Sequence, residues 1–201
     1  MSDKNATPNH PIHELIAKRW SPYAFDDQRS VSPEDLKSLF EAARWAPSSY
    51  NEQPWRFMVG MRAEPEIFNK ALGCLVDANR EWAQNASVIV LTAVSENFDK
   101  NGKPNAAAEH DLGLAVANLV LEATARGLMV HQMIGINTEE VRTKFHVPKG
   151  FHPLTAIAVG YRLSEEEASG KFAERDSSPR QRKLLKEFVF GANWKAIPEW
   201  L

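Results

Sequence analysis

The run Val88-Ile89-Val90-Leu91 constrains the fold of this chain most strongly. It is apolar without a break and rich in β-branched side chains, a pattern typical of a strand that is buried on both faces. Helical patterns alternate with this and a few other strand patterns, and neither an internal repeat nor a domain linker interrupts them. We therefore predict one α+β domain spanning residues 1–201, built of two or three layers.

Start signals and helical spacing predict the remaining elements. Ser32-Pro33-Glu34-Asp35 combines a cap, a first-turn proline and acidic residues, which marks a helix start. Residues 106–126 form the longest helical pattern, with small residues around its apolar side. We therefore expect this helix to be buried, and a second copy of the chain is one candidate for the surface that covers it. Further predicted segments are helices at 10–18, from Pro65 and after Asn137, strands at 57–59, 128–133 and 153–161, a loop at 97–105, and a capping-box match from Ser164 to Glu167.

Composition narrows the class of protein. The chain has 201 residues, a hydrophobic fraction of 43% and a net charge of −2, so it can build a core and nothing global points to nucleic acid or to an anionic membrane. The single cysteine, Cys74, excludes an intrachain disulfide and fits a reducing compartment. Residues 1–9 are polar, which predicts a flexible N-terminus without a signal peptide, and no apolar run reaches the length of a membrane span. We expect a cytoplasmic protein.

A polar loop lies between a helical pattern and a strand pattern. Pro47 and Pro54 bracket a run of short polar side chains that includes Ser48, Ser49 and Asn51. Hydroxyls, an amide and backbone N–H groups at such a junction can bind a small molecule, although an ordinary turn would look the same.

Arg19 and Ser21 form a second candidate binding group. Pro22 disfavours a helical conformation at Ser21, so the first helix should end about there and leave both residues at a helix-to-loop junction. An arginine fork and a hydroxyl suit a phosphate. The alternative is a surface arginine that covers Trp20.

The C-terminal segment is basic and then apolar. Arg180-Gln181-Arg182-Lys183 precede Phe188, Phe190 and Trp194. Aromatic side chains at this density are expected to be covered, either by the same protomer or by a partner.

Several catalytic and binding motifs are missing from the sequence. There is no G-x-G-x-x-G, no phosphate-binding G-x-x-x-x-G-K-[ST], no H-E-x-x-H and no G-x-S-x-G. We interpret His10, His13 and the cluster Glu109-His110-Asp111 as exposed polar groups, and Cys74 as a core residue, so we predict no metal site. If the chain is an enzyme, a cofactor should carry the chemistry.

Five segments, in sequence order, together resemble the FMN-dependent nitroreductase family. Arg19-Trp20-Ser21-Pro22-Tyr23-Ala24-Phe25-Asp26 resembles the family's opening motif, and Ala42 to Phe57 is similar to its second. The other three are Asn79-Arg80-Glu81-Trp82-Ala83, His131-Gln132-Met133-Ile134-Gly135 and the segment from Arg180 to Phe190. The resemblance runs from about residue 12 to residue 195.

This resemblance implies a central, mostly antiparallel sheet flanked by helices in an intertwined homodimer, with FMN at the dimer interface and residues 180–201 on the partner subunit. It implies that the flavin carries the chemistry and that no side chain need act as a catalyst. The cofactor-binding residues carried over by position are Arg19, Trp20 and Ser21 for the phosphate and ribityl chain, with Arg180 or Arg182; Pro47, Ser48, Ser49 and Asn51, partly from the other subunit; Asn79 for the pyrimidine edge; and Gln132, Met133, Ile134 and Gly135 along the ring.

Tyr23 departs from the family pattern, which usually has arginine or lysine there. Losing that cation weakens the phosphate site or changes the residue that supplies the charge. The resemblance implies hydride transfer from NADH or NADPH through flavin N5 to a nitroaromatic, a quinone or another small electrophile. Two alternatives stay open: another reaction on the same fold, such as dehalogenation or dehydrogenation, and a non-catalytic flavin-binding dimer, which only Tyr23 favours.

Overall fold

The computed structural model describes residues 4–164 and 166–201. Five strands form the sheet: β1 (Phe25–Asp26), β2 (Trp55–Met61), β3 (Val88–Ser95), β4 (Met129–Met133) and β5 (Phe151–Arg162). The helices are α1 (Glu14–Lys18), α2 (Pro33–Arg44), α3 (Pro65–Leu72), α4 (Asp77–Ala83), α5 (Ala108–Ala125), α6 (Thr138–Lys144) and α7 (Gly170–Ser177), with 3-10 turns η1 (Ser49–Asn51) and η2 (Leu185–Glu187).

Every strand pairing described is antiparallel, and β5 pairs with β1, β3 and β4. The order is β1-β5-β3-β2, and β4 pairs with β5 along Met129–Met133. All eight residues of β3 are buried, as the continuous apolar run predicts. The α+β class and the antiparallel sheet predicted from the sequence are confirmed.

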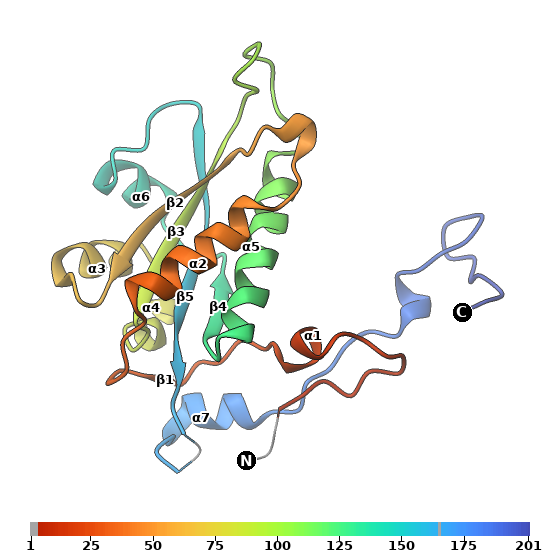
Figure 1. Ribbon diagram of the computed structural model, residues 1–201, viewed down its shortest axis with the longest axis horizontal. Coiled ribbons are helices and arrows are strands. Elements are labelled where there is room, and N and C mark those ends of the chain that lie inside the picture. Colours follow the sequence, from red (N-terminus) through yellow and green to blue (C-terminus); the bar gives the residue numbers. More distant parts are fainter. Residues whose placement is uncertain (1–3, 165) are drawn as a thin grey trace.

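Alternating side chains of β3 divide the core into two parts. Val88 and Val90 face a cluster that includes residues of α2 and α5, whereas Ile89 and Leu91 face one that includes residues of α3 and α4. The sheet therefore lies between two helical layers, with α2 and α5 on one face (Figure 1). This decides between the two-layer and three-layer alternatives.

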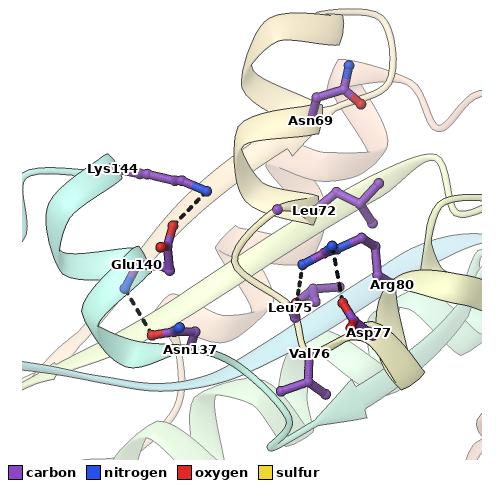
Figure 2. A pocket seen from close by; sticks show the side chains of 10 residues that line it. Asn69, Leu72, Leu75, Val76, Asp77, Arg80, Asn137, Glu140 and Lys144 are labelled. Atoms are coloured by element: carbon purple, nitrogen blue, oxygen red, sulfur yellow. Dashed lines mark hydrogen bonds and ion pairs between the residues drawn. The ribbon is translucent and has the colours of Figure 1, made fainter.

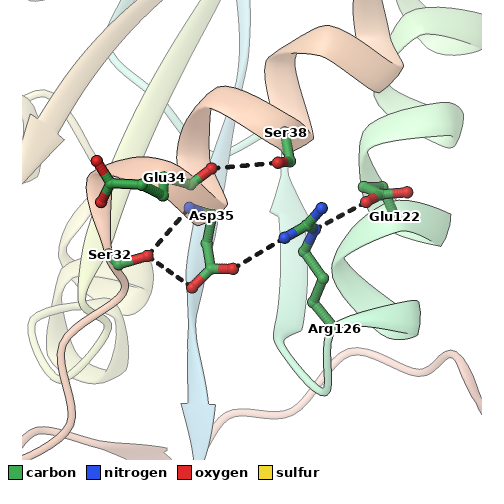
Figure 3. A network of polar contacts seen from close by, with 6 residues as sticks. All are labelled: Ser32, Glu34, Asp35, Ser38, Glu122 and Arg126. Carbon is green, nitrogen blue, oxygen red and sulfur yellow. Dashed lines mark hydrogen bonds and ion pairs between the residues drawn. The ribbon is translucent and has the colours of Figure 1, made fainter.

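A polar network joins α2 to α5 at the surface (Figure 3). Ser32 caps α2, as predicted, and its hydroxyl accepts from the Asp35 backbone N–H at 3.0 Å. Arg126, just after α5, pairs with Asp35 at 3.2 Å and with Glu122 at 2.7 Å. These groups are partly exposed, so the ion pairs contribute little to the stability of the domain. Their main effect is to fix the position of α2 relative to α5.

Some element boundaries differ from the sequence-based predictions. The helix expected over residues 10–18 is confined to Glu14–Lys18, because His13 provides its N-cap. Ser164 and Glu167 do hydrogen-bond to each other, but the following helix begins only at Gly170. The helix predicted over 106–126 forms as Ala108–Ala125, and Cys74 is buried in the core.

The two ends of the chain run side by side at one edge of the domain. Of the segment predicted to be flexible, residues 1–3 lie outside the described residues, and the Ala6 N–H donates to the Ala17 carbonyl at 2.9 Å. The segment after α7 extends away from the body of the domain (Figure 1). Its large apolar side chains are exposed, Trp194 at 81%; the others are Leu184, Leu185, Phe188, Ile197 and Trp200. Among the described residues, no helix is long and apolar enough to cross a membrane.

Candidate cofactor site

A pocket of about 560 Å³ lies along the edge strand β4 and the loop that follows it. Its lining comes from α4, β4, β5 and the Ile134–Gly135 turn: Val76, Asn79, His131, Gln132, Met133, Ile134, Gly135 and Thr155. The structure therefore brings together two groups that the family resemblance predicts to bind the cofactor, Asn79 and residues 132–135.

Gly135 allows a close approach between the β4 turn and α4. A Cβ atom at this position would lie 2.4 Å from Asn79 Nδ2 and 2.8 Å from Val76 Cγ2. The Gly135 carbonyl accepts from the Asn79 side chain and from the Val76 backbone N–H, both at 3.1 Å. Glycine is needed here because a larger side chain would displace Asn79 from the pocket.

The turn after β4 exposes an apolar surface beside these polar groups. Ile134 is 85% exposed, whereas the preceding Met133 is buried. An apolar side chain held outward next to amide groups suits a flat ligand that has an apolar face and a polar edge.

A cluster of arginines forms where the end of α1 meets the segment after α7. Arg19 Nη1 donates to Ser21 Oγ at 3.2 Å. Burial lowers the pKa of Arg19, and the positive charges of Arg180 and Arg182 lower it further. Arg180 is partly buried, and its Nη1 donates to the Lys4 and Ala17 carbonyls at 3.0 and 2.6 Å. Mutual repulsion of this kind among guanidinium groups is typical of a site for an anion.

Trp20 is buried, and its ring is contacted by cations other than Arg19. Lys4 Nζ lies 4.4 Å from the ring centroid and Arg162 Cζ lies 5.1 Å from it. The Arg19 guanidinium itself is hydrogen-bonded to Ser21 Oγ.

His131 connects the arginine segment to the pocket. Its Nδ1 lies 2.7 Å from the Pro22 carbonyl oxygen, which can only accept, so Nδ1 carries the proton. Burial lowers the pKa of His131, although the bond to Pro22 acts in the opposite direction. Through the bond to Pro22, His131 holds residues 19–23 against β4.

Tyr23, the residue that departs from the family pattern, is enclosed by other groups. Its ring lies 4.6 Å from that of His131 and 5.3 Å from that of Trp82, measured between centroids. Its backbone N–H donates to both carboxylate oxygens of Asp176, and its hydroxyl accepts from Arg175 Nη2 at 2.7 Å. Sequence reasoning missed Arg175 and Asp176. No local pattern marks them, because their partner lies about 150 residues away.

The Pro47 loop lies in another part of the domain, beside the N-terminal end of α5 (Figure 1). The Ser49 N–H donates to the buried Asp111 carboxylate at 2.9 Å, and Ser48 Oγ accepts from the Gln53 N–H at 3.0 Å. Four predicted cofactor residues come from this loop, and none of them lines the β4 pocket: Pro47, Ser48, Ser49 and Asn51. Within one chain the structure does not bring the two groups together.

The same loop has an unusual backbone. Tyr50, Asn51 and Gln53 have φ angles of 54°, 57° and 52°, in the left-handed region that side chains other than glycine rarely adopt. Residues held in this way cost about 1–3 kcal/mol each and are concentrated at functional sites.

A larger pocket, of about 650 Å³, lies between α3, α4 and α6 (Figure 2). Its two cations are each paired with a carboxylate, Lys144 with Glu140 at 2.7 Å and Arg80 with Asp77 at 3.2 Å. Such paired charges attract an anion less than the arginine cluster does.

Comparison with known proteins identifies the family. The model of the nitroreductase family matches residues 16–89 and 67–161. An uncharacterised 15.4 kDa protein of Mycolicibacterium smegmatis is 36% identical over 146 residues, which cover 69% of this chain and 97% of that protein. The major NAD(P)H-flavin oxidoreductase of Aliivibrio fischeri is 24% identical over 219 residues, 90% of this chain and 98% of that one.

Solved structures agree with this result. The crystal structure of an oxidoreductase containing FMN superimposes with a TM-score of 0.88 at 30% identity, covering 98% of this chain and 100% of that one. A nitroreductase family protein from Clostridium difficile superimposes with a TM-score of 0.70 at 25% identity, covering 92% and 100%.

The chain belongs to the nitroreductase family. The family inferred from the sequence motifs is confirmed, and with it, at the level of the family, the prediction of an NAD(P)H-dependent flavin oxidoreductase that uses FMN. The individual site residues and the homodimer stay predictions.

Proposed function

We propose that this protein is an FMN-dependent oxidoreductase that passes electrons from NADH or NADPH to nitroaromatic, quinone or related small electrophilic acceptors. The observation that carries the proposal is that the segment bearing Arg19, a member of the arginine cluster, is hydrogen-bonded through the Pro22 carbonyl to His131, which lines the β4 pocket. Together the cluster and the pocket match a ligand with an anionic tail and a flat, largely apolar head.

The arginine cluster fits the phosphate of FMN. That phosphate carries close to two negative charges. The charges of Arg180 and Arg182 lower the pKa of Arg19, and the charge of Arg182 also lowers that of Arg180, so the three arginines lie close together. Ser21 orients the Arg19 guanidinium through their hydrogen bond at 3.2 Å. Bound phosphate would replace repulsion among the arginines by attraction.

The β4 pocket fits the ring. Met133 and Ile134 provide apolar surface, and Asn79, after donating one N–H to Gly135, retains an amide that can bond the pyrimidine edge. The backbone N–H groups of the Ile134–Gly135 turn would lie near N5. When bound, FMN supplies the redox chemistry, since it accepts a hydride at N5 and transfers two electrons to the acceptor.

A second copy of the chain would complete the site. The Pro47 loop does not line the pocket of its own chain, and the apolar segment from Leu184 to Trp200 is exposed in a single copy. Helix α5 also exposes small residues, including Gly113 and Ala117, where another helix could approach closely. In the homodimer, the loop of one subunit would lie over the pocket of the other. The C-terminal extension beyond Arg180, whose guanidinium bonds to the Lys4 and Ala17 carbonyls of its own chain, would pack on the partner.

Shared sites can be tested by mixing two inactive variants. One variant, Arg19→Ala, removes an arginine from the proposed phosphate-binding cluster. The other, Asn51→Ala, alters the Pro47 loop. If each site takes its loop from the partner, a heterodimer of the two variants contains one site with both defects and one with neither. About half of the wild-type FMN binding per dimer should then return. If every site were built within one chain, mixing would restore nothing.

Nothing in the described part of the chain favours dehalogenation or dehydrogenation over this proposal, and Tyr23 is the one feature that favours a non-catalytic role. The preferred donor and acceptor can be measured with FMN-reconstituted protein and a panel of nitroaromatics, quinones and halogenated phenols. We expect NAD(P)H oxidation that depends on the first two classes. Arg19→Ala should weaken FMN binding, whereas Lys18→Ala, an adjacent cation paired with Glu14 at 3.1 Å, should not. Bound FMN without any acceptor-dependent oxidation of NADH or NADPH would overturn the proposal.

A further inference from the structure

Helix α7 places a cation on the side chain of Tyr23. Arg175 Cζ lies 3.9 Å from the centroid of the Tyr23 ring, and Arg175 Nη2 donates to the Tyr23 hydroxyl at 2.7 Å. One contact uses the ring face and the other uses the polar tip, so the guanidinium is held in a defined place although Arg175 is exposed.

Asp176, the residue after Arg175, binds the backbone of the Tyr23 segment and not its side chain. Asp176 is only 5% exposed, and its carboxylate accepts from the backbone N–H groups of Tyr23 and Ala24 at 2.8–3.0 Å. Its lone pairs are therefore directed at the backbone, away from the guanidinium of Arg175. Through these contacts, α7 fixes both the backbone and the side chain of the segment that carries Arg19.

The charge of Arg175 acts on the same region as that of Arg19. Both cations lower the pKa of His131, whose ring lines the β4 pocket and lies 4.6 Å from the Tyr23 ring. The Tyr23 ring thus links Arg175 to His131 and the pocket, whereas Arg180 and Arg182 lie close to Arg19.

We propose that Arg175 is an FMN-binding residue whose guanidinium, held on the Tyr23 ring, supplies positive charge to the cofactor. The proposal rests on the proposed function, because it concerns the same cofactor site. Tyr23 then acts as a support for a cation that comes from α7, some 150 residues later in the sequence.

The position of the charge, rather than the packing of side chains, is what the test must isolate. Arg175→Gln keeps a side chain long enough to cover the Tyr23 ring but removes the charge. The double variant Tyr23→Arg/Arg175→Ala removes the Tyr–Arg contact and moves a cation to position 23. Lys171→Ala is the matched control, since it removes one positive charge from the same helix, where Lys171 pairs with Glu81.

FMN dissociation constants are measured on apoprotein by quenching of flavin fluorescence, at low and high salt, after circular dichroism has shown that each variant is folded. We expect Arg175→Gln to weaken FMN binding about tenfold and to reduce its salt dependence. Tyr23→Arg/Arg175→Ala should recover most of the affinity, and Lys171→Ala should bind as the wild type does.

Two results would overturn the inference while leaving the proposed function intact: unchanged FMN affinity in Arg175→Gln, or no recovery in a folded double variant. If the wild-type apoprotein itself failed to bind FMN, the proposed function would fall instead. The experiment therefore separates the two claims.

Discussion

Removing the Asp176 carboxylate should destabilise the whole domain, although Asp176 belongs to a short helix near its edge. The carboxylate is buried and accepts from the Tyr23 N–H at 2.8 and 3.0 Å and from the Ala24 N–H at 2.9 Å. Asp176→Ala leaves both backbone donors without this acceptor. A buried donor that loses its partner costs about 1–3 kcal/mol, and Tyr23 and Ala24 are only half-buried, so we expect a total of about 3 kcal/mol.

The loss should be visible in thermal unfolding. For a chain of this size, about 3 kcal/mol corresponds to a Tm lower by about 6–12 °C. Asp176→Asn should lose much less, because Oδ2 accepts from both N–H groups and an asparagine can place its oxygen there. Differential scanning calorimetry of both variants gives the comparison.

Glu174→Ala is the matched control for this prediction, since Glu174 is an exposed acid on the same helix. If Asp176→Ala unfolds at the temperature of the Glu174→Ala variant, the carboxylate does not anchor the 19–24 segment and the reasoning is wrong. FMN binding should weaken in parallel with Tm, because Arg19 lies on the anchored segment.

Three further predictions concern single residues. Gly135→Ala should weaken FMN binding about tenfold, because the new Cβ would lie 2.4 Å from Asn79 Nδ2; an unchanged dissociation constant would show that Asn79 moves without cost. His131 has a pKa lowered by burial, so the unfolded state takes up its proton first as pH falls below about 6.5. Between pH 7.5 and 5.5, His131→Gln should therefore lose less unfolding free energy than the wild type, and equal losses would contradict this. Cys74 is buried and its thiol pKa is raised by burial, so Ellman's reagent should label it only after denaturation; rapid labelling of native protein would refute the assignment to the core.

Local patterns predicted the elements that position the site. The run at Val88–Leu91 forms the first half of a buried strand, and the cap signals at Ser32 and Asn137 mark real helix starts. These predictions succeed because neighbouring residues determine strand burial and helix capping. The grouping of Asn79 with residues 132–135 came from the family resemblance, and the structure brings these residues to one pocket.

Contacts between distant segments could not be predicted in the same way. Arg175 and Asp176 look like solvated charges in a polar segment, and their roles depend on Tyr23 and Ala24, about 150 residues earlier. The left-handed backbone at Tyr50 and Gln53 was also missed. Asn51 was its only local signal, because asparagine tolerates this conformation better than most residues.

The most direct test of the proposed function is the visible absorption spectrum of the purified protein, recorded without oxygen before and after addition of NADH or NADPH. The proposal predicts a flavin spectrum that bleaches on addition of the donor and returns when a quinone or nitroaromatic is added. A colourless protein that also fails to take up added FMN would contradict it, and would show that the arginine cluster and the β4 pocket do not form a flavin site.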